Sequence, residues 1–435
     1  MPRVAVAAAM MLLSLTVLTA QGTRPWRQDP VFQQIAAALA DVPAIDNHSH
    51  LLSVAAFDPS FDTGMPLRLR SDNPEYAAVL KERLGLDWDP AHARESDAEG
   101  RRRRTARMAE LGGEAAYWTE YLDYSRTGIV LVNQERPQGT NGQRLRWVPH
   151  ATTLLLPMRM DALEARSPMA MEDYGKARTH LLELQQADGL NGPPERLDDY
   201  LAFLGRQLAR WKQQGAVALK FYDAYHRTLR FEEVPREQAR LLWTKGRRQP
   251  LDRSESLALQ DHLAWEIFRL AGPLGLPVHI HSSHGAGPFL RLQESDVRNL
   301  ENVLTDPRFF GTNFVLIHGG APWHEAAAYL ASNKAHVWID LSAMPFLYSV
   351  PDLAAVIEKY LLFAPERTLF GVDAMGYFGT PVGAEFVHLA LSRHLREALS
   401  LALAHMVRDG VVDQTRAISI GRAVLRENAR RLYGI

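Results

Sequence analysis

The stretch AIDNHSH, residues 44–50, decides how the rest of this chain is interpreted. Two apolar residues precede an aspartate, and His48 and His50 then stand on either side of a small serine. Residues two apart in an extended strand point to the same face, so both imidazoles lie close together at the end of a short apolar run. Imidazole is a good ligand for zinc, and two imidazoles from one strand make half of a metal site. A pair of this kind is a weak signal alone, so the case depends on the later strands.

The rest of the chain contains further apolar segments that are typical of buried strands, and helical patterns separate most of them. Continuous apolar runs that alternate with helices indicate an α/β fold with a parallel sheet buried on both faces. Eight such units within roughly 350 residues fit a (β/α)8 TIM-type barrel better than an open doubly wound sheet. The predicted strands are 44–48, 127–133, a third within 145–156 with 154–157 as its best segment, 215–222, 277–281, 313–320, 336–341 and 368–373.

The connection after the first strand has a different character. Residues 51–122 carry Pro, Asp and Arg together with three helical patterns. Long connections in compact domains are usually lids or binding loops, so we expect a helical insertion folded over a site. We interpret the basic run 101–104 within it as a solvated helix face. The whole of 23–435 is expected to form one barrel domain.

Composition excludes several classes of function. The chain has 435 residues, of which 46% are hydrophobic and 23% charged, and its net charge is −1. This balance indicates no general attraction to nucleic acid or to an anionic membrane, so we expect a small-molecule substrate and no nucleic-acid partner. The absence of cysteine excludes disulfides, zinc fingers and thiol nucleophiles. This composition is also compatible with a homo-oligomer.

The first residues resemble an export signal. Arg3 supplies a positive charge, the segment 4–18 is almost entirely apolar, and small residues follow at Ala20 and Gly22. This pattern is typical of a cleavable signal peptide over residues 1–22, with an uncleaved anchor as the alternative. We therefore expect a periplasmic or secreted protein with no stable membrane span after the signal is removed.

Polar side chains stand at the carboxyl ends of five of the predicted strands. In a barrel of parallel strands these ends meet at one rim, where active sites lie. A single such residue is more often a core or capping residue, but the same pattern at several strand ends indicates a shared metal site. We expect His48, His50, Lys220, His281, His318 and Asp373 to line one cup at this rim, which favours a metal site there. His279, two residues before His281, is expected to fill the barrel interior.

Six segments in this order carry a resemblance to a known family: 46–50 (DNHSH), Lys220, 278–281 (VHIH), 315–320 (VLIHGG), 370–373 (FGVD) and 428–433 (NARRLY). The set resembles the metal-dependent hydrolases of the amidohydrolase superfamily. The most similar branch is the amidohydrolase-related group, which also includes decarboxylases. The likeness covers most of the chain from Asp41 onward, except the insertion. Many members have Gly-Ser-Asp where this chain has Gly-Val-Asp, a difference that keeps the carboxylate.

The resemblance implies a set of metal ligands. His48, His50 and Asp373 would hold the more buried ion, and His281 and His318 would hold a second ion or assist with the first. One or two divalent ions are implied, and ligand sets of histidine and carboxylate favour zinc.

The resemblance also implies how the site would work. Lys220 would be carboxylated, so that its carbamate bridges two ions, whereas an unmodified lysine would indicate a one-metal site or a substrate-binding ammonium. A water between the ions would become the nucleophile. Asp373 would take the proton of that water and pass it to the leaving group.

The loops after the strands are expected to bind the substrate, through Tyr222, Tyr225, His284 and His324. The leading hypothesis is an exported metal-dependent hydrolase that cleaves an amide, cyclic amide, peptide or lactone bond. The alternative enzyme is a one-metal decarboxylase of the same superfamily. A third hypothesis is a non-catalytic metal-binding barrel, because a fold alone does not fix a function.

Overall fold

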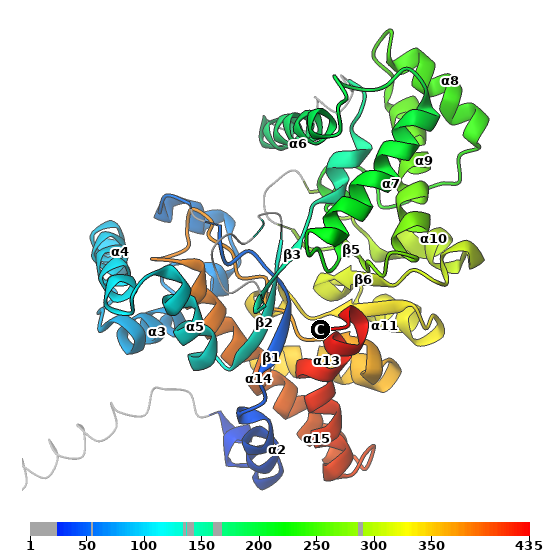
Figure 1. Ribbon diagram of the computed structural model, residues 1–435. Coiled ribbons are helices and arrows are strands. Elements are labelled where there is room, and N and C mark those ends of the chain that lie inside the picture. The colour runs from blue at the N-terminus through cyan, green and yellow to red at the C-terminus, as the bar shows by residue number, and fades with distance from the viewer. Residues whose placement is uncertain (1–23, 54, 134–135, 137–142, 160–167, 286–289) are drawn as a thin grey trace, which may run out of the picture.

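The computed structural model describes residues 24–53, 55–133, 136, 143–159, 168–285 and 290–435 (Figure 1). The predicted signal peptide therefore lies outside the described residues. Within them the strands form two parallel sheets, one of three strands in the order β1-β2-β3 and one of five in the order β4-β5-β6-β7-β8. The strands are β1 Ala44–Ser49, β2 Thr127–Asn133, β3 Leu145–Val148, β4 Leu219–Phe221, β5 Val278–His281, β6 Phe314–Ile317, β7 Val337–Asp340 and β8 Thr368–Leu369.

Backbone contacts join the edges of the two sheets on both sides. Between β3 and β4, parallel bridges pair Trp147 with Ala216 and His150 with Lys220. On the other side, the amide of Asn47 donates to the carbonyl of Phe370 at 2.9 Å, beyond the end of β8. All eight strands thus follow one another in space in the order of the chain.

Alternation along the strands separates two apolar cores. In β6, the side chains of Val315 and Ile317 belong to a small apolar cluster on the inner face of the strands. Those of Phe314 and Leu316 belong to the large core packed against the helices. Register places His279 beside Val315 and His281 beside Ile317, so these histidines share the inner face. Successive residues of one apolar strand therefore point alternately to the interior and to the layer of helices.

Helices surround the sheets (Figure 1). α14 is the most deeply buried of the long ones, with 19 of its 25 residues in the interior, which suits a helix packed on several neighbours. The helices that follow β2 are α6 Pro168–Ala187, α7 Leu197–Gln213, α8 Arg236–Gly246, α9 Arg253–Ala271, α10 Glu301–Thr305, α11 His324–Asn333, α12 Met344–Leu347, α13 Val350–Phe363, α14 Ala384–Arg408, α15 Gln414–Arg422 and α16 Asn428–Tyr433.

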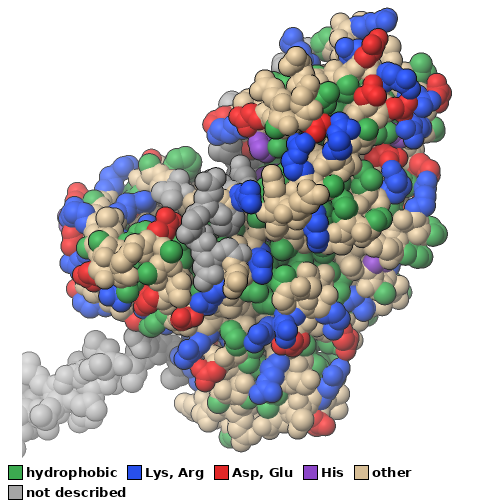
Figure 2. Space-filling model, viewed as in Figure 1, with side chains coloured by type: hydrophobic (Ala, Val, Ile, Leu, Met, Phe, Trp, Pro, Cys, Tyr) green, Lys and Arg blue, Asp and Glu red, His purple; other side chains and the backbone are tan. Residues whose placement is uncertain are grey.

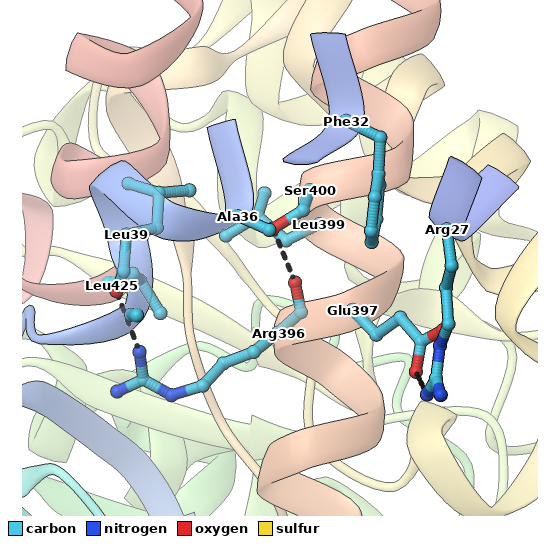
Figure 3. A pocket seen from close by; sticks show the side chains of 10 residues that line it. Arg27, Phe32, Ala36, Leu39, Arg396, Glu397, Leu399, Ser400 and Leu425 are labelled. Atoms are coloured by element: carbon cyan, nitrogen blue, oxygen red, sulfur yellow. Dashed lines mark hydrogen bonds and ion pairs between the residues drawn. The ribbon is translucent and has the colours of Figure 1, made fainter. Parts of the chain in front are cut away.

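Helix α2, Pro30–Ala40, packs along α14 before the chain enters β1. Phe32 and Leu39 of α2 line a cavity of about 280 Å³ against α14 (Figure 3). Glu397 of α14 accepts hydrogen bonds from Arg27 and Trp26, each at 2.8 Å. These contacts attach the first described residues to the body of the protein.

Three helices lie between β1 and β2: α3 Pro74–Leu84, α4 Ala93–Glu110 and α5 Glu114–Tyr124. They form a group on one side of the molecule (Figure 1). The basic run of α4 is divided between two faces. Arg102 and Arg103 bind Glu99 on the same exposed helix, in agreement with a solvated face. Arg104 instead forms an ion pair with the buried Glu385 of α14, so the solvated interpretation is wrong for this residue.

Several boundaries differ from the predicted ones. The third strand, β3, lies within the predicted 145–156, but the preferred segment 154–157 is wrong, because Ala151–Leu155 forms a 3-10 turn after the strand has ended. β8 stops at Leu369, since the backbone must bend to reach the left-handed conformation at Asp373. At the C-terminal end of the chain, a π-helical turn at Ala423–Glu427 separates α15 from α16.

None of the helices in the described ranges is both long enough and apolar enough to cross a membrane. On the face drawn in Figure 2, basic and acidic side chains of the described residues are interspersed. This mixture agrees with the near-zero net charge of the sequence.

Candidate metal centre

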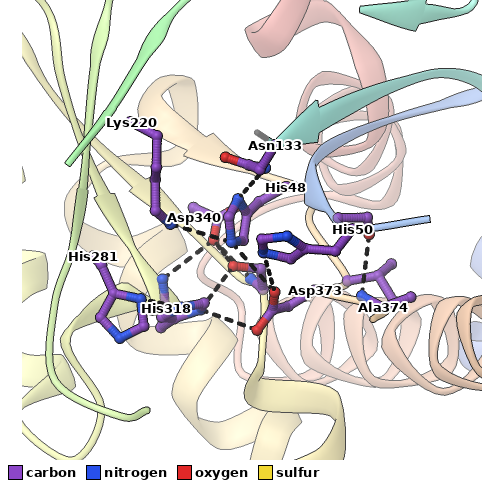
Figure 4. Close-up of polar contacts among 12 residues, drawn as sticks. His48, His50, Asn133, Lys220, His281, His318, Asp340, Asp373 and Ala374 are labelled. Carbon is purple, nitrogen blue, oxygen red and sulfur yellow. Dashed lines mark hydrogen bonds and ion pairs between the residues drawn. The ribbon is translucent and has the colours of Figure 1, made fainter. Parts of the chain in front are cut away.

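Backbone hydrogen bonds join the end of β1 to the segment that follows β8, and this pairing assembles the centre. The amide of Asp373 donates to the carbonyl of His48, and that of His50 donates to the carbonyl of Ala374, each at 2.7 Å. The carboxylate of Asp373 is thereby held beside two imidazoles (Figure 4). Its Oδ1 lies 3.3 Å from Nε2 of His48 and 3.7 Å from Nε2 of His50.

His318 enters from β6 and completes a cluster. Its Nδ1 lies 3.9 Å from Oδ2 of Asp373 and 3.0 Å from the hydroxyl of Ser342. His48, His318 and Asp373 each offer one ligand atom, and these three atoms all lie within 4.8 Å of one another. All three residues are buried. This spacing suits ligands around a single ion.

Lys220 and His281 extend the cluster. Nζ of Lys220 lies 3.2 Å from Nε2 of His48, and Nδ1 of His281 lies 3.1 Å from Nε2 of His318 (Figure 4). Together with His50 they line a cavity of about 420 Å³ that includes the three-ligand cluster. The structure therefore brings all six predicted metal ligands into one cup.

Burial controls the protonation of these groups. It lowers the pKa of His48, His281 and His318 well below the usual range of an imidazole, and the charge of Lys220 adds to the effect. These rings are therefore neutral at pH 7, which is the form that binds a metal. Burial also lowers the pKa of Lys220 to about 7 and raises that of Asp373, while the attraction between the two opposes both shifts.

The donor atoms fit a divalent cation. Oδ1 of Asp373 and Nε2 of His281 are buried and have no hydrogen-bond partner among the described residues. Nδ1 of His48 lies 2.6 Å from the amide group of Asn133, whose Oδ1 is also without a partner. Turning that amide over lets Oδ1 accept Nδ1–H of His48 and leaves Nε2 free for an ion.

A carboxylate at the start of the motif fixes the end of β1. Oδ1 of Asp46 accepts the backbone amides of His48 at 3.2 Å and Val372 at 3.0 Å. Its Oδ2 lies 3.2 Å from Nε2 of His388 on α14, whose Nδ1 lies 2.6 Å from the hydroxyl of Tyr121 on α5. Asp46 thus connects the metal-binding strand to two helices. The sequence analysis missed His388, because nothing in the pattern of α14 distinguishes this histidine from other buried ones.

A second buried carboxylate supports His318. Asp340, at the end of β7, accepts the backbone amide of His318 at 3.2 Å and the side-chain amide of Asn47 at 2.8 Å. Asn47 also accepts a hydrogen bond from the hydroxyl of Tyr433 on α16, and that hydroxyl lies 2.7 Å from Nε2 of His279. His279 therefore faces the interior network below the cup. The signal available in the sequence was the aspartate next to the last residue of the predicted strand 336–341.

The backbone at the cup is unusual in two ways. His318 and Asp373 have φ values of 68° and 61°, a conformation that non-glycine residues rarely adopt and that persists where the surroundings enforce it. At Gly371 a Cβ atom would lie 2.2 Å from Oδ2 of Asp340, so only glycine fits there. The Gly-Val-Asp sequence therefore combines a close contact between Gly371 and Asp340 with a left-handed backbone conformation at Asp373.

The predicted substrate residues divide into two groups. Tyr222 and Tyr225 line the cavity. His284 is not among its lining residues and packs against Phe346, with ring centroids 5.7 Å apart. His324 begins α11, close to the charge of Lys359, and does not line the cavity either. The cavity wall also contains residues that the sequence analysis missed, namely Ser53, His150, Asp173, Met375 and Gly376.

Comparison with known proteins identifies the family. The model of the Amidohydrolase family matches residues 202–435, which is more than half of the chain. The chain therefore belongs to the amidohydrolase family, and the expected resemblance to these metal-dependent enzymes is confirmed. A curated relative, Protein fluG of Emericella nidulans, is 26% identical over 158 residues; the match spans 36% of this chain and only 17% of fluG.

Solved structures share the fold at low sequence identity. A metal-dependent hydrolase from Lactobacillus casei is similar with a TM-score of 0.58 at 17% identity, covering 92% of this chain and 97% of the other. Uronate isomerase from Thermotoga maritima gives 0.59 at 13%, covering 93% and 97%. Glucuronate isomerase from Caulobacter crescentus gives 0.56 at 16%, covering 94% and 95%. These similarities establish an α/β fold with parallel sheets. The similar structures include a hydrolase and isomerases, so the fold alone does not identify the type of reaction.

Proposed function

We propose that this protein is a metal-dependent hydrolase of an amide, cyclic amide, peptide or lactone bond. The observation that carries the proposal is the meeting of His48, His318 and Asp373 around one point, with a carboxylate oxygen that has no other partner. The cavity of about 420 Å³ beside them has room for a small molecule.

In this proposal His48, His50, His318 and Asp373 hold the cation, which supplies Lewis-acid polarisation of a carbonyl and acidifies water. Asp373 accepts the proton of the attacking water and returns it to the leaving group. The carboxylate suits that task, because its Oδ1 has no hydrogen-bond partner among the described residues. Tyr222 and Tyr225 position the substrate from the cavity wall.

Lys220 determines whether one or two ions bind. A carbamate forms on a neutral amine, and the pKa of about 7 gives Lys220 a substantial neutral fraction at physiological pH. We propose that the neutral Lys220 amine adds CO₂ and loses a proton, so that its carbamate would supply ligands for a second ion, which His281 would help to hold through its unpartnered Nε2. Zinc is the proposed metal because the ligands are imidazoles and carboxylates.

The second candidate is a one-metal decarboxylase. The observation in its favour is that His48, His318 and Asp373 form the single group of closely spaced metal-capable side chains found in the described ranges. An unmodified Lys220 would then offer an ammonium to a substrate carboxylate. Release of CO₂ without consumption of water would favour this reaction over hydrolysis.

We further propose that the two sheets close into one (β/α)8 barrel, with 51–122 as an insertion over its rim. Support comes from the bridges between β3 and β4 and from the hydrogen bonds between β1 and the segment after β8. The apolar start of the sequence supports export, with residues 1–22 as signal peptide and the mature protein in the periplasm or outside the cell.

Metal content and turnover test the proposal together. Purified protein loaded with Zn²⁺ or Mn²⁺ is expected to cleave members of a panel of amides, peptides and lactones, and a chelator is expected to abolish cleavage. Wild type is expected to hold two ions per chain, and Lys220→Ala one or none. Exposed Lys81→Ala serves as the matched control, since this lysine pairs with Asp87 on the surface. One ion in both proteins would remove the bridging role of Lys220.

A further inference from the structure

His150 occupies a junction between two cavities. It follows β3, where its backbone pairs with Lys220 and where the carbonyl of Pro149 accepts the amide of Lys220 at 2.9 Å. His150 lines the cup and also a second cavity of about 350 Å³. Asp173 and Tyr222 line both cavities as well. The second cavity therefore adjoins the proposed substrate site.

The imidazole of His150 has an unused polar atom. Its Nε2 is buried and has no hydrogen-bond partner among the described residues, while the ring packs against Tyr222 with centroids 4.7 Å apart. A buried polar atom without a partner destabilises the folded state, so such atoms in folded proteins usually have a reason. The ring is held in place by Tyr222 and by its own strand end, so the atom is available to a ligand in a fixed position.

The second cavity has aromatic and aliphatic side chains together with several charged ones in its lining. Trp147 and Trp211 contribute aromatic rings 6.3 Å apart in an edge-to-face arrangement, and Ala177 and Leu184 of α6 also line the cavity. Lys176 pairs with Glu172 and Arg210 with Asp188, each at 2.6 Å, and the guanidinium of Arg136 lies 5.9 Å from the ring centroid of Trp147. Indole surfaces bind flat apolar groups well, whereas paired charges offer little to a free ion.

We propose that the second cavity is a substrate subsite for a flat apolar group, and that His150 hydrogen-bonds the amide or ester group to which this moiety is attached. The substrate class is thus an amide or ester with an aromatic group on one side of the bond to be cleaved. This inference rests on the proposed hydrolase function, but the binding it describes is measurable without turnover.

Two probes with the same amide bond test the subsite: N-benzoylglycine, which has a flat ring, and N-acetylglycine, which lacks it. Calorimetric titrations use the metal-loaded Asp373→Asn protein, in which turnover is suppressed. N-benzoylglycine is expected to bind at least about tenfold more tightly than N-acetylglycine, because the ring buries apolar surface. His150→Phe in that protein is expected to weaken binding of N-benzoylglycine about tenfold, since Phe keeps the ring but cannot hydrogen-bond.

Two further variants complete the design. Ala187→Trp, at an exposed position that lines the second cavity, is expected to abolish the preference for N-benzoylglycine without weakening N-acetylglycine. His92→Phe, at an exposed position immediately before α4, is the matched control and should change neither affinity. Equal affinity for the two probes, undetectable binding of both, or an effect of His150→Phe no larger than that of His92→Phe would overturn the inference. Intact probe preference with no hydrolysis by wild type would instead count against the hydrolase proposal alone and support the subsite.

Discussion

At the scale of single residues, Asp373 is the group on which the chemistry depends most directly. We expect Asp373→Asn to lower kcat by about 10²–10⁴-fold, because an amide oxygen can still contact a cation but cannot accept a proton. The measurements are kcat on any substrate that wild type cleaves and the metal content of both proteins. Asp41→Asn, at a side chain 86% exposed, is the control and should leave both unchanged. A wild-type kcat in Asp373→Asn would exclude this residue as the base.

Individual residues also show what the sequence can and cannot predict. His48, His50, His281, His318 and Asp373 could be found because each follows an apolar strand, and parallel strands bring their ends together. His150 was missed because the third strand was placed too late in the chain, which hid the fact that this histidine follows a strand. His388 lies within a helix whose side chains are nearly all buried, so only the folded structure reveals its proximity to Asp46.

At the scale of elements, Glu75 connects α3 to the segment before it and to α14. It accepts a hydrogen bond from Arg68 at 2.7 Å, and it lies 3.7 Å from Nδ1 of His394. Burial raises the pKa of Glu75, but interactions with His394 and Arg68 outweigh it and lower the pKa from 4.5 to about 2. A depressed pKa means that the ionised form stabilises the fold above pH 4.5, and that this stabilisation is lost as the pH falls towards 2.

We therefore expect Glu75→Gln to lower the free energy of unfolding by about 1–2 kcal/mol at pH 7. The difference from wild type should shrink below pH 4.5 and disappear near pH 2. Denaturant unfolding at a series of pH values measures it. Glu183→Gln, on an exposed side chain of α6, is the control and should show no such pH dependence. A difference that stays constant from pH 7 to pH 3 would contradict the assigned role.

At the scale of the whole molecule, the C-terminal helix closes the interior beneath the cup. Ala429 and Tyr433 of α16 belong to the same inner cluster as Ile45 of β1 and Val315 of β6. The hydroxyl of Tyr433 connects this cluster to Asn47 and thus to the network that supports His318. The last helix therefore contributes to the same interior as the first strand, an arrangement that helix and strand periodicity could not predict because it depends on contacts between distant segments.

We expect Tyr433→Phe to lower the free energy of unfolding by about 1–3 kcal/mol, because Asn47 and His279 each lose a buried partner. Thermal unfolding with the metal content held constant measures the change. Tyr329→Phe, at a side chain 63% exposed, should stay within about 0.5 kcal/mol of wild type. Equal effects of the two substitutions on the free energy of unfolding would show that the hydrogen bonds of the Tyr433 hydroxyl do not stabilise the interior.

The close approach at Gly371 has a practical consequence for anyone who wishes to retarget this protein. Even one added methyl group there would collide with Asp340 and disturb the support of His318, so randomising this codon would mainly produce inactive clones. Tyr222 and Tyr225 line the cavity, and neither is one of the residues that support His318 from below. A mutant library for new substrates should keep Gly371 fixed and vary those two tyrosines.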